Sequence, residues 1–169
     1  MAFWLNLGQI QKLNAKKFPN TVALMDKYRA FTYPQMNKRV NKLAHSLVSL
    51  GLQKGDKVAV LLENSIEIVE LFLATAKTGI IIVPINFRLV GPEVEYIVTN
   101  SDAKAFVVHD QFVTTVGPIR KNLNNIARDK YIVVGQSHDG YNDYEALIKN
   151  SSDSEPQIEV DVEDTWILI

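Results

Sequence analysis

The chain has no cysteine among its 169 residues. This absence excludes a disulfide framework, a thiolate nucleophile and a zinc site built on cysteine ligands. An excess of charge of either sign is also missing: the net charge is −1 and the pI is near 6.3. Nucleic-acid-binding proteins usually carry a basic patch or stripe, so this balance argues against that class. The sequence contains neither a G-x-G-x-x-G dinucleotide motif nor a G-x-S-x-G nucleophile elbow.

Long apolar runs are missing too. The longest uncharged apolar stretch, residues 78–84, is far shorter than the roughly 20 residues that span a bilayer. Residues 1–7 are apolar but lack the basic region and the long apolar region of a signal peptide. We therefore expect a cytoplasmic protein without a transmembrane segment.

What is present is the pattern of an α/β fold. The chain is 47% hydrophobic and 22% charged, which is enough to bury the core of a single domain spanning residues 1–169. Strands alternate with helices, so we predict a largely parallel sheet with helices on both faces. The predicted strands are residues 21–25, 30–32, 57–62, 80–84, 105–108 and 131–134. The predicted helices are residues 6–17, 32–51, 65–79, 92–99, part of 113–123, and 144–148.

Two helices carry specific predictions. Thr32 and Gln35 have the spacing of a capping box at the start of one helix. On the helix of residues 65–79, Asn64 is the predicted cap and nearly every residue is apolar except a stripe of Glu67, Glu70 and Lys77. We interpret Glu67 and Glu70 as charges on the helix face that interact with its dipole. On the preceding helix, residues 37–39 and Lys42 are predicted to form an ordinary solvated face.

Most searches for a reactive site return nothing. Residues 135–140 (GQSHDG) have the gap of a phosphate-binding loop, but Tyr141 and Asn142 stand where Lys and Ser or Thr are required. We therefore interpret this segment as a surface turn. The three histidines are scattered, and none has the i, i+4 spacing of a metal pair. His109, followed by Asp110 at the end of a strand, is the best placed of them, because ligands of open α/β sheets gather there.

Four segments, taken in order, resemble the core motifs of the adenylate-forming enzyme superfamily. Residues 31–36 (FTYPQM) resemble its first motif, L-T-Y-x-E-L, with Gln and Met in place of the usual Glu and Leu. The other three are residues 51–60 (GLQKGDKVAV), residues 64–67 (NSIE) and residues 76–89 (AKTGIIIVPINFRL), which resembles the second core motif. Together they cover most of residues 20–110.

Residues 86–89 (NFRL) are similar to the acyl-CoA synthetase branch, since peptide-synthetase adenylation domains usually carry an Asp after the proline. The resemblance is nearest to bacterial long-chain fatty-acyl-CoA synthetases. It implies an ATP-dependent ligase that converts a fatty acid to an acyl-adenylate and then to acyl-CoA. ATP, Mg²⁺ and CoA would serve the whole enzyme, and none is expected to bind tightly to this chain alone.

The resemblance gives one candidate site, at Asn86, Phe87 and Arg88. It implies that these residues lie near the CoA or acyl channel, just beyond the carboxyl end of a strand. Arg88 suits a phosphate or carboxylate because its guanidinium is always charged and can bind in a bidentate manner. The alternative is that Arg88 braces the loop through a local carboxylate or carbonyl while Phe87 packs in the core. We assign no catalytic residue and no metal ligand.

The chain stops on residues 164–169 (DTWILI), an apolar run typical of a strand that should lead into a turn. In the family, the triphosphate-binding loop follows such a strand. We therefore expect an N-terminal piece of a larger enzyme, inactive alone, whose partners are the rest of that enzyme and a carboxylate substrate. We also expect a homo-oligomer or self-association. Two alternatives stay open: a free-standing α/β binding module without catalysis, and an interaction protein that dimerises through exposed sheet.

Overall fold

The computed structural model describes residues 6–169, so most of the predicted non-signal segment, residues 1–5, lies outside the described residues. The strands are β1 (Val22–Met25), β2 (Ala30–Thr32), β3 (Lys57–Leu61), β4 (Ile81–Pro84), β5 (Ala105–His109), β6 (Tyr131–Val134) and β7 (Asn142–Asp143). The α-helices are α1 (Leu7–Lys17), α2 (Tyr33–Ser49), α3 (Ile66–Thr78), α4 (Gly91–Asn100), α5 (Val113–Val116) and α6 (Tyr144–Lys149). Short 3-10 turns cover Asp110–Phe112, Arg120–Asn122 and Arg128–Lys130.

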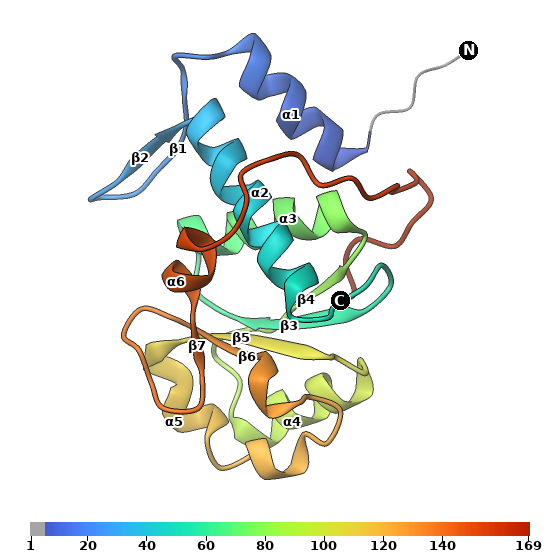
Figure 1. The fold of residues 1–169 in the computed structure, drawn as a ribbon. Coiled ribbons are helices and arrows are strands. Elements are labelled where there is room, and N and C mark those ends of the chain that lie inside the picture. Colours follow the sequence, from blue (N-terminus) through green and yellow to red (C-terminus); the bar gives the residue numbers. More distant parts are fainter. Residues whose placement is uncertain (1–5) are drawn as a thin grey trace.

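The predicted parallel sheet is confirmed. Five parallel strands run in the order β4-β3-β5-β6-β7. Helices α2, α3 and α6 cover one face of this sheet, and α4 and α5 cover the other (Figure 1). A separate antiparallel hairpin, β1-β2, stands beside the start of α2.

Alternation along the buried strands builds two cores, one on each face. On β3, Val58 and Val60 face α2 and α3, whereas Ala59 and Leu61 face the α4 side. Strands β5 and β6 alternate in the same way. Because side chains of a strand point to opposite faces in turn, a continuous apolar run is the pattern of a strand buried on both sides.

Helix α1 is present, but the apolar stripe that the sequence shows is not its buried face. Leu7, Ile10 and Leu13 are exposed, whereas Gly8 and Gln11 face the interior. The reason is a close approach between two helices. A Cβ atom on Gly8 would lie 2.9 Å from Lys77 Cγ and 3.0 Å from the Ala76 carbonyl oxygen of α3. A small residue therefore decides which face of α1 packs inward.

The helix starts are partly as predicted. The Thr32–Gln35 capping box is confirmed, with the Thr32 amide donating to Gln35 Oε1 at 2.8 Å. The predicted Asn64 cap of α3 is wrong, because Ser65 occupies the N-cap and its hydroxyl accepts from the Ile68 amide at 3.3 Å. Between residues 113 and 123 the helix breaks after Val116, at Gly117 and Pro118, and only a 3-10 turn follows.

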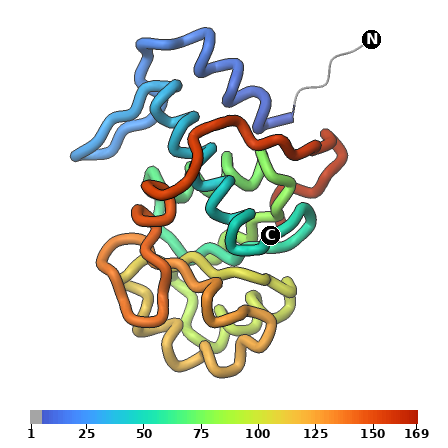
Figure 2. Tube along the Cα trace, in the orientation of Figure 1, coloured from blue at the N-terminus to red at the C-terminus, as the bar shows by residue number. Residues whose placement is uncertain are grey.

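The predicted final strand forms only in part. Residues 150–169, called the C-terminal segment below, cross α2 and α3 without a regular element and return to the edge of the sheet (Figure 2). There Ile167 makes a single parallel bridge to Ile82 of β4. No helix within residues 6–169 is long and apolar enough to cross a membrane.

Candidate functional site

The carboxyl edge of the sheet is where this topology exposes strand ends to a ligand. Strand β3 is followed by α3 on one face, whereas β5 is followed by α5 on the other. Neighbouring strands whose connections leave on opposite faces mark the switch point at which open α/β sheets bind their ligands. All five strands are parallel, so the segments after β3, β4, β5 and β6 meet at this edge.

The predicted site residues lie at this edge, in a turn directly after β4. Asn86 Oδ1 accepts from the Arg88 amide at 3.0 Å, and the Asn86 carbonyl accepts from the Leu89 amide at 3.1 Å. Phe87 is half-buried and stacks on Phe112, with ring centroids 6.3 Å apart. The Arg88 guanidinium is exposed and lies 5.6 Å from the centroid of the Phe87 ring.

These contacts separate the two interpretations of the turn. Phe87 packs against the core on the α4 side, as the structural alternative expected of it. Within the part of the chain that the structure describes, Arg88 forms no ion pair and its guanidinium donates no hydrogen bond to a carbonyl. The Asn86 and Phe87 contacts therefore hold the turn, and the Arg88 guanidinium is exposed on it without an ion pair among residues 6–169.

A crevice of about 370 Å³ opens beside the switch point. It is lined by Arg29, Ser65, Glu67, His109, Val133, Val134, Gly135, Asp143, Tyr144 and Glu145. His109, the best-placed histidine of the sequence, lies on its wall with Nδ1 2.8 Å from Asp110 Oδ1. Three carboxylates and one guanidinium line the crevice, and the Arg29 guanidinium is paired with Glu67 at 2.7 Å.

The phosphate-loop pattern of residues 135–140 has no room for a phosphate at its start. The Asp110 carboxylate occupies that place: it accepts from the Gln136 amide at 2.8 Å. This backbone hydrogen bond lowers the pKa of Asp110 below its ordinary value. A Cβ on Gly135 would lie 2.7 Å from Asp110 Oδ2, so glycine allows the carboxylate to approach. The prediction of a surface turn agrees with this geometry.

The predicted solvated face of α2 is wrong for Arg39, which binds Glu70 in the charged stripe of α3. Glu70 is fully buried and receives hydrogen bonds from Arg39 Nε, from Arg39 Nη2 at 3.2 Å and from the Tyr144 hydroxyl at 2.7 Å. Burial raises the pKa of Glu70, and the bonds from Arg39 and Tyr144 oppose this rise. Arg39 also pairs with Glu145 at 2.7 Å, so the network joins α2, α3 and α6.

Lys77 belongs to a second buried network on the same helix. Its ammonium donates to Asn37 Oδ1 at 2.8 Å, Asn41 Oδ1 at 2.7 Å and Glu155 Oε2 at 2.7 Å. Asn37, predicted to be solvated, is buried as well. The sequence of α3 held one signal that points to burial. Its polar stripe is so narrow that the helix has too little polar surface to face water. Its charges then need partners on other elements.

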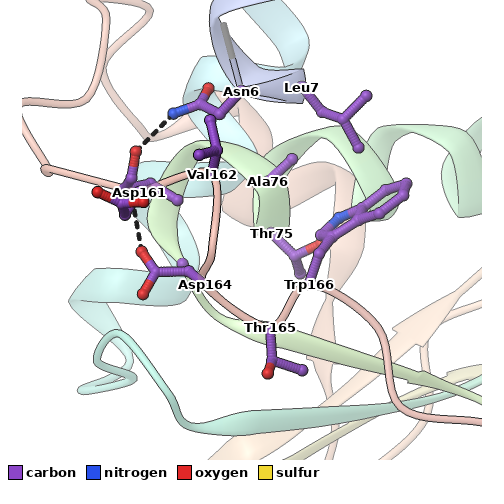
Figure 3. A pocket seen from close by; sticks show the side chains of 11 residues that line it. Asn6, Leu7, Thr75, Ala76, Asp161, Val162, Asp164, Thr165 and Trp166 are labelled. Carbon is purple, nitrogen blue, oxygen red and sulfur yellow. Dashed lines mark hydrogen bonds between the residues drawn. The ribbon is translucent and has the colours of Figure 1, made fainter. Parts of the chain in front are cut away.

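A smaller pocket of about 180 Å³ lies under the C-terminal segment (Figure 3). The Trp166 indole and the Leu7 side chain flank it, with Thr75 and Ala76 of α3 behind them. Trp166 Nε1 donates to the Phe72 carbonyl at 2.9 Å. The pocket is therefore a gap between the C-terminal segment and α3. Among residues 6–169, no three His, Asp or Glu side chains converge as a metal site requires.

Comparison with known proteins places this geometry in one family. The family model described as AMP-binding enzyme matches residues 12–169. A medium/long-chain-fatty-acid–CoA/3-oxocholest-4-en-26-oate–CoA ligase of Mycobacterium marinum is 32% identical over 99% of this chain. The long-chain-fatty-acid–CoA ligase FadD13 of Mycobacterium tuberculosis is 37% identical over 68% of it. The chain spans only 32% of the first relative and 23% of the second.

Solved structures agree with the sequence relatives. The anthranilate CoA ligase AuaEII in complex with anthranoyl-AMP matches 99% of this chain with a TM-score of 0.92 and 28% identity, over 32% of its own length. The N-terminal domain of FACL13 from Mycobacterium tuberculosis matches 97% of this chain with a TM-score of 0.88 and 29% identity, over 41% of its own length. The fold, the order of the four sequence motifs and the family match over nearly the whole chain agree, and the chain belongs to the AMP-binding enzyme family.

Proposed function

We propose that this chain forms the N-terminal subdomain of an ATP-dependent fatty-acyl-CoA ligase and has no ligase activity by itself. The whole enzyme would convert a fatty acid, ATP and CoA to acyl-CoA, AMP and pyrophosphate through an acyl-adenylate. The observation that carries the proposal is the match of 99% of this chain to about a third of a fatty-acid–CoA ligase.

The chemistry explains why the chain alone is expected to be inactive. A carboxylate is a poor electrophile, so it must attack the α-phosphorus of ATP and displace pyrophosphate before a thiol can displace AMP. Such transfers need a preorganised cradle that stabilises charge on the triphosphate. Within residues 6–169 the one loop with glycine spacing of that kind is filled by Asp110. The triphosphate, its Mg²⁺ and the acyl-adenylate are therefore assigned to the remainder of the enzyme, which is the main partner of this chain.

Asn86, Phe87 and Arg88 are proposed as one wall of the CoA or acyl channel. Arg88 would bind a phosphate of CoA or the substrate carboxylate through its exposed guanidinium. Two observations support this role. The Asn86 side chain and the Phe87 ring hold the turn in place. The parallel bridge between Ile167 and Ile82 also directs the C-terminal segment toward the same edge of the sheet. The cytoplasmic location stays a prediction from the sequence.

The test is a ligase assay on a longer protein that carries the chain's continuation. ATP–pyrophosphate exchange with palmitate would report the adenylate step, and acyl-CoA would be measured by mass spectrometry. We expect both activities in the longer protein and neither in the 169-residue chain. Absence of exchange with fatty acids of every chain length would contradict the proposal.

Arg88 can be tested in the same assay. Arg88→Ala should raise the KM for CoA or for the fatty acid about tenfold or more, since a charge-assisted hydrogen bond contributes about 1.5–3 kcal/mol. Arg128→Ala is the matched control, because Arg128 is also exposed but lies before the amino end of β6, at the opposite edge of the sheet. Equal KM values for the Arg88 variant and the parent protein would remove Arg88 from the channel.

The alternative, a binding module without catalysis, makes a different prediction for the 169-residue chain. It should then bind CoA, ATP or a fatty acid in calorimetry with micromolar affinity. Absence of heat for all three ligands agrees with the subdomain proposal.

A further inference from the structure

The C-terminal segment has no helix or strand to fix its course over α2 and α3. Its place is set by separate polar contacts along its length. The Asp153 carbonyl accepts from Asn41 Nδ2 at 2.9 Å, and the Val160 carbonyl accepts from Asn6 Nδ2 at 2.7 Å. Near its end, Trp166 donates to α3 and Leu168 donates to the Ile82 carbonyl at 3.0 Å.

The contact between Lys77 and Glu155 differs from these because it is ionic and buried. The Lys77 side chain is 4% exposed and that of Glu155 is 26% exposed. All three ammonium protons are used, and the second oxygen of Glu155 accepts from Asn37 Nδ2 at 2.7 Å. Helix α1 covers this network, because Gly8 lies close to Lys77. The side chains that bind the ammonium are therefore themselves paired, Asn37 with Glu155 and Asn41 with the Asp153 carbonyl.

Stability alone does not explain a lysine at this position. Replacing a buried ion pair by apolar side chains of similar volume is often neutral or stabilising, because the pair loses its hydration. What the pair adds is geometry, since Glu155 binds Lys77 through one carboxylate oxygen and Asn37 through the other. The other ion pairs of the segment, Lys38–Asp153 and Lys54–Asp164, use lysines that are 67% and 42% exposed, compared with 4% for Lys77. Exposed pairs contribute little.

We propose that Lys77 is a positioning residue: through Glu155 it fixes the course of the C-terminal segment, and thereby the register of residues 166–168 beside β4. The consequence for catalysis rests on the proposed function, in which this segment leads into the triphosphate-binding loop. A segment held in one register would deliver that loop to the edge that carries Arg88. The placement itself is a property of the 169-residue chain and needs no ATP.

Amide hydrogen exchange, followed by NMR on the 169-residue chain, tests the placement. The Leu168 and Ile82 amides, which bond across the bridge, report the register of the segment. Amides of β5 and β6, in the middle of the sheet, report opening of the whole fold. In Lys77→Met/Glu155→Met we expect the Leu168 and Ile82 amides to exchange about tenfold faster or more, while β5 and β6 change by less than about threefold.

Lys38→Met is the matched control. It removes a lysine of α2 that pairs with Asp153 of the same segment at 3.7 Å, but in solvent. Its exchange pattern should equal that of the unmodified chain. Should the double variant fail to fold, Glu155→Gln keeps the shape and loses the charge, and the same two amides should accelerate by a smaller factor.

Two results would overturn the proposal. One is unchanged exchange of Leu168 and Ile82 in the variants. The other is equal acceleration of all amides, which would make the pair a general stabiliser. The exchange experiment uses no nucleotide, so a negative ligase assay would not change its result. In an active longer protein, Lys77→Met should raise the KM for ATP by a larger factor than it lowers kcat.

Discussion

Replacing Arg39 by methionine should strongly destabilise this fold. Arg39 is the main partner of Glu70, whose side chain is 0% exposed between α2 and α3. Methionine keeps the aliphatic stem and removes every donor, so Glu70 would retain only the bond from the Tyr144 hydroxyl at 2.7 Å. Removing one partner of a buried pair costs about 3–5 kcal/mol, because it leaves a buried charge without compensation.

The assay is urea unfolding at pH 7, followed by circular dichroism, which gives the free energy of unfolding. Stabilities of natural domains are about 5–15 kcal/mol, so a loss of this size is a large fraction of the total. The slope of the free energy against urea should stay constant, since the folded structure is retained. Lys38→Met, which removes an exposed pair on the same helix, should cost less than about 1 kcal/mol.

The pH dependence of the variant gives a second readout. Burial raises the pKa of Glu70 even with Arg39 in place, and loss of Arg39 should raise it further. The folded variant then holds a proton that the unfolded chain releases above its ordinary pKa of about 4.3. Its stability should therefore rise relative to the unmodified chain as the pH falls from 7 toward about 4.5.

A matched variant separates the buried charge from lost packing. Arg39→Met/Glu70→Met/Tyr144→Phe removes all three polar partners together, and we expect it to recover most of the lost stability. If Arg39→Met costs less than about 1 kcal/mol at pH 7, or if its deficit does not shrink in acid, Glu70 is not a buried, compensated charge.

Three further predictions concern the other contacts. Burial raises the pKa of Glu155, but the bonds from Lys77 and Asn37 outweigh it and hold the pKa below its ordinary value. The stability from this group should be lost as the pH falls below about 4, and Lys77→Met should raise the Glu155 pKa in a carboxyl ¹³C titration. Thr32→Ala, which removes the N-cap bond to the Gln35 amide, should lower the free energy of unfolding by about 0.5–2 kcal/mol in urea titrations. Met25, Tyr28 and Leu168 expose apolar surface, so we expect self-association in light scattering, and a monomer at high concentration would contradict this.

Periodicity predicted the elements of this fold well, because it depends on residues close in sequence. Residues 58–62 are apolar at every position, and β3 is indeed covered on both faces. The capping box at Thr32 was readable for the same reason, since its two bonds join residues three positions apart. Even here the packing of a neighbour can override the pattern: Gly8 approaches α3 so closely that α1 buries Gln11 and exposes Leu13.

The polar networks could not be located in this way, because their partners come from distant parts of the chain. Arg39 meets Glu70 31 positions later and Glu145 106 positions later. Spacing along one helix does not contain such pairings. The candidate turn shows the opposite case: its place after β4 followed from strand order, while the role proposed for Arg88 depends on a bound ligand.

The two networks on α3 also explain why so much charge sits on a buried helix. Apolar contacts would hold α2 against α3 in several neighbouring positions, because packing of aliphatic side chains is not directional. Arg39–Glu70 and the bonds from Lys77 to Asn37 and Asn41 each select one of these positions. The first also fixes α6 through Glu145 and Tyr144, and the second fixes the C-terminal segment. Since α6 leads directly into that segment, the two contacts set both its start and its course. The charges on α3 therefore act as placement contacts for the chain that runs to the β4 edge.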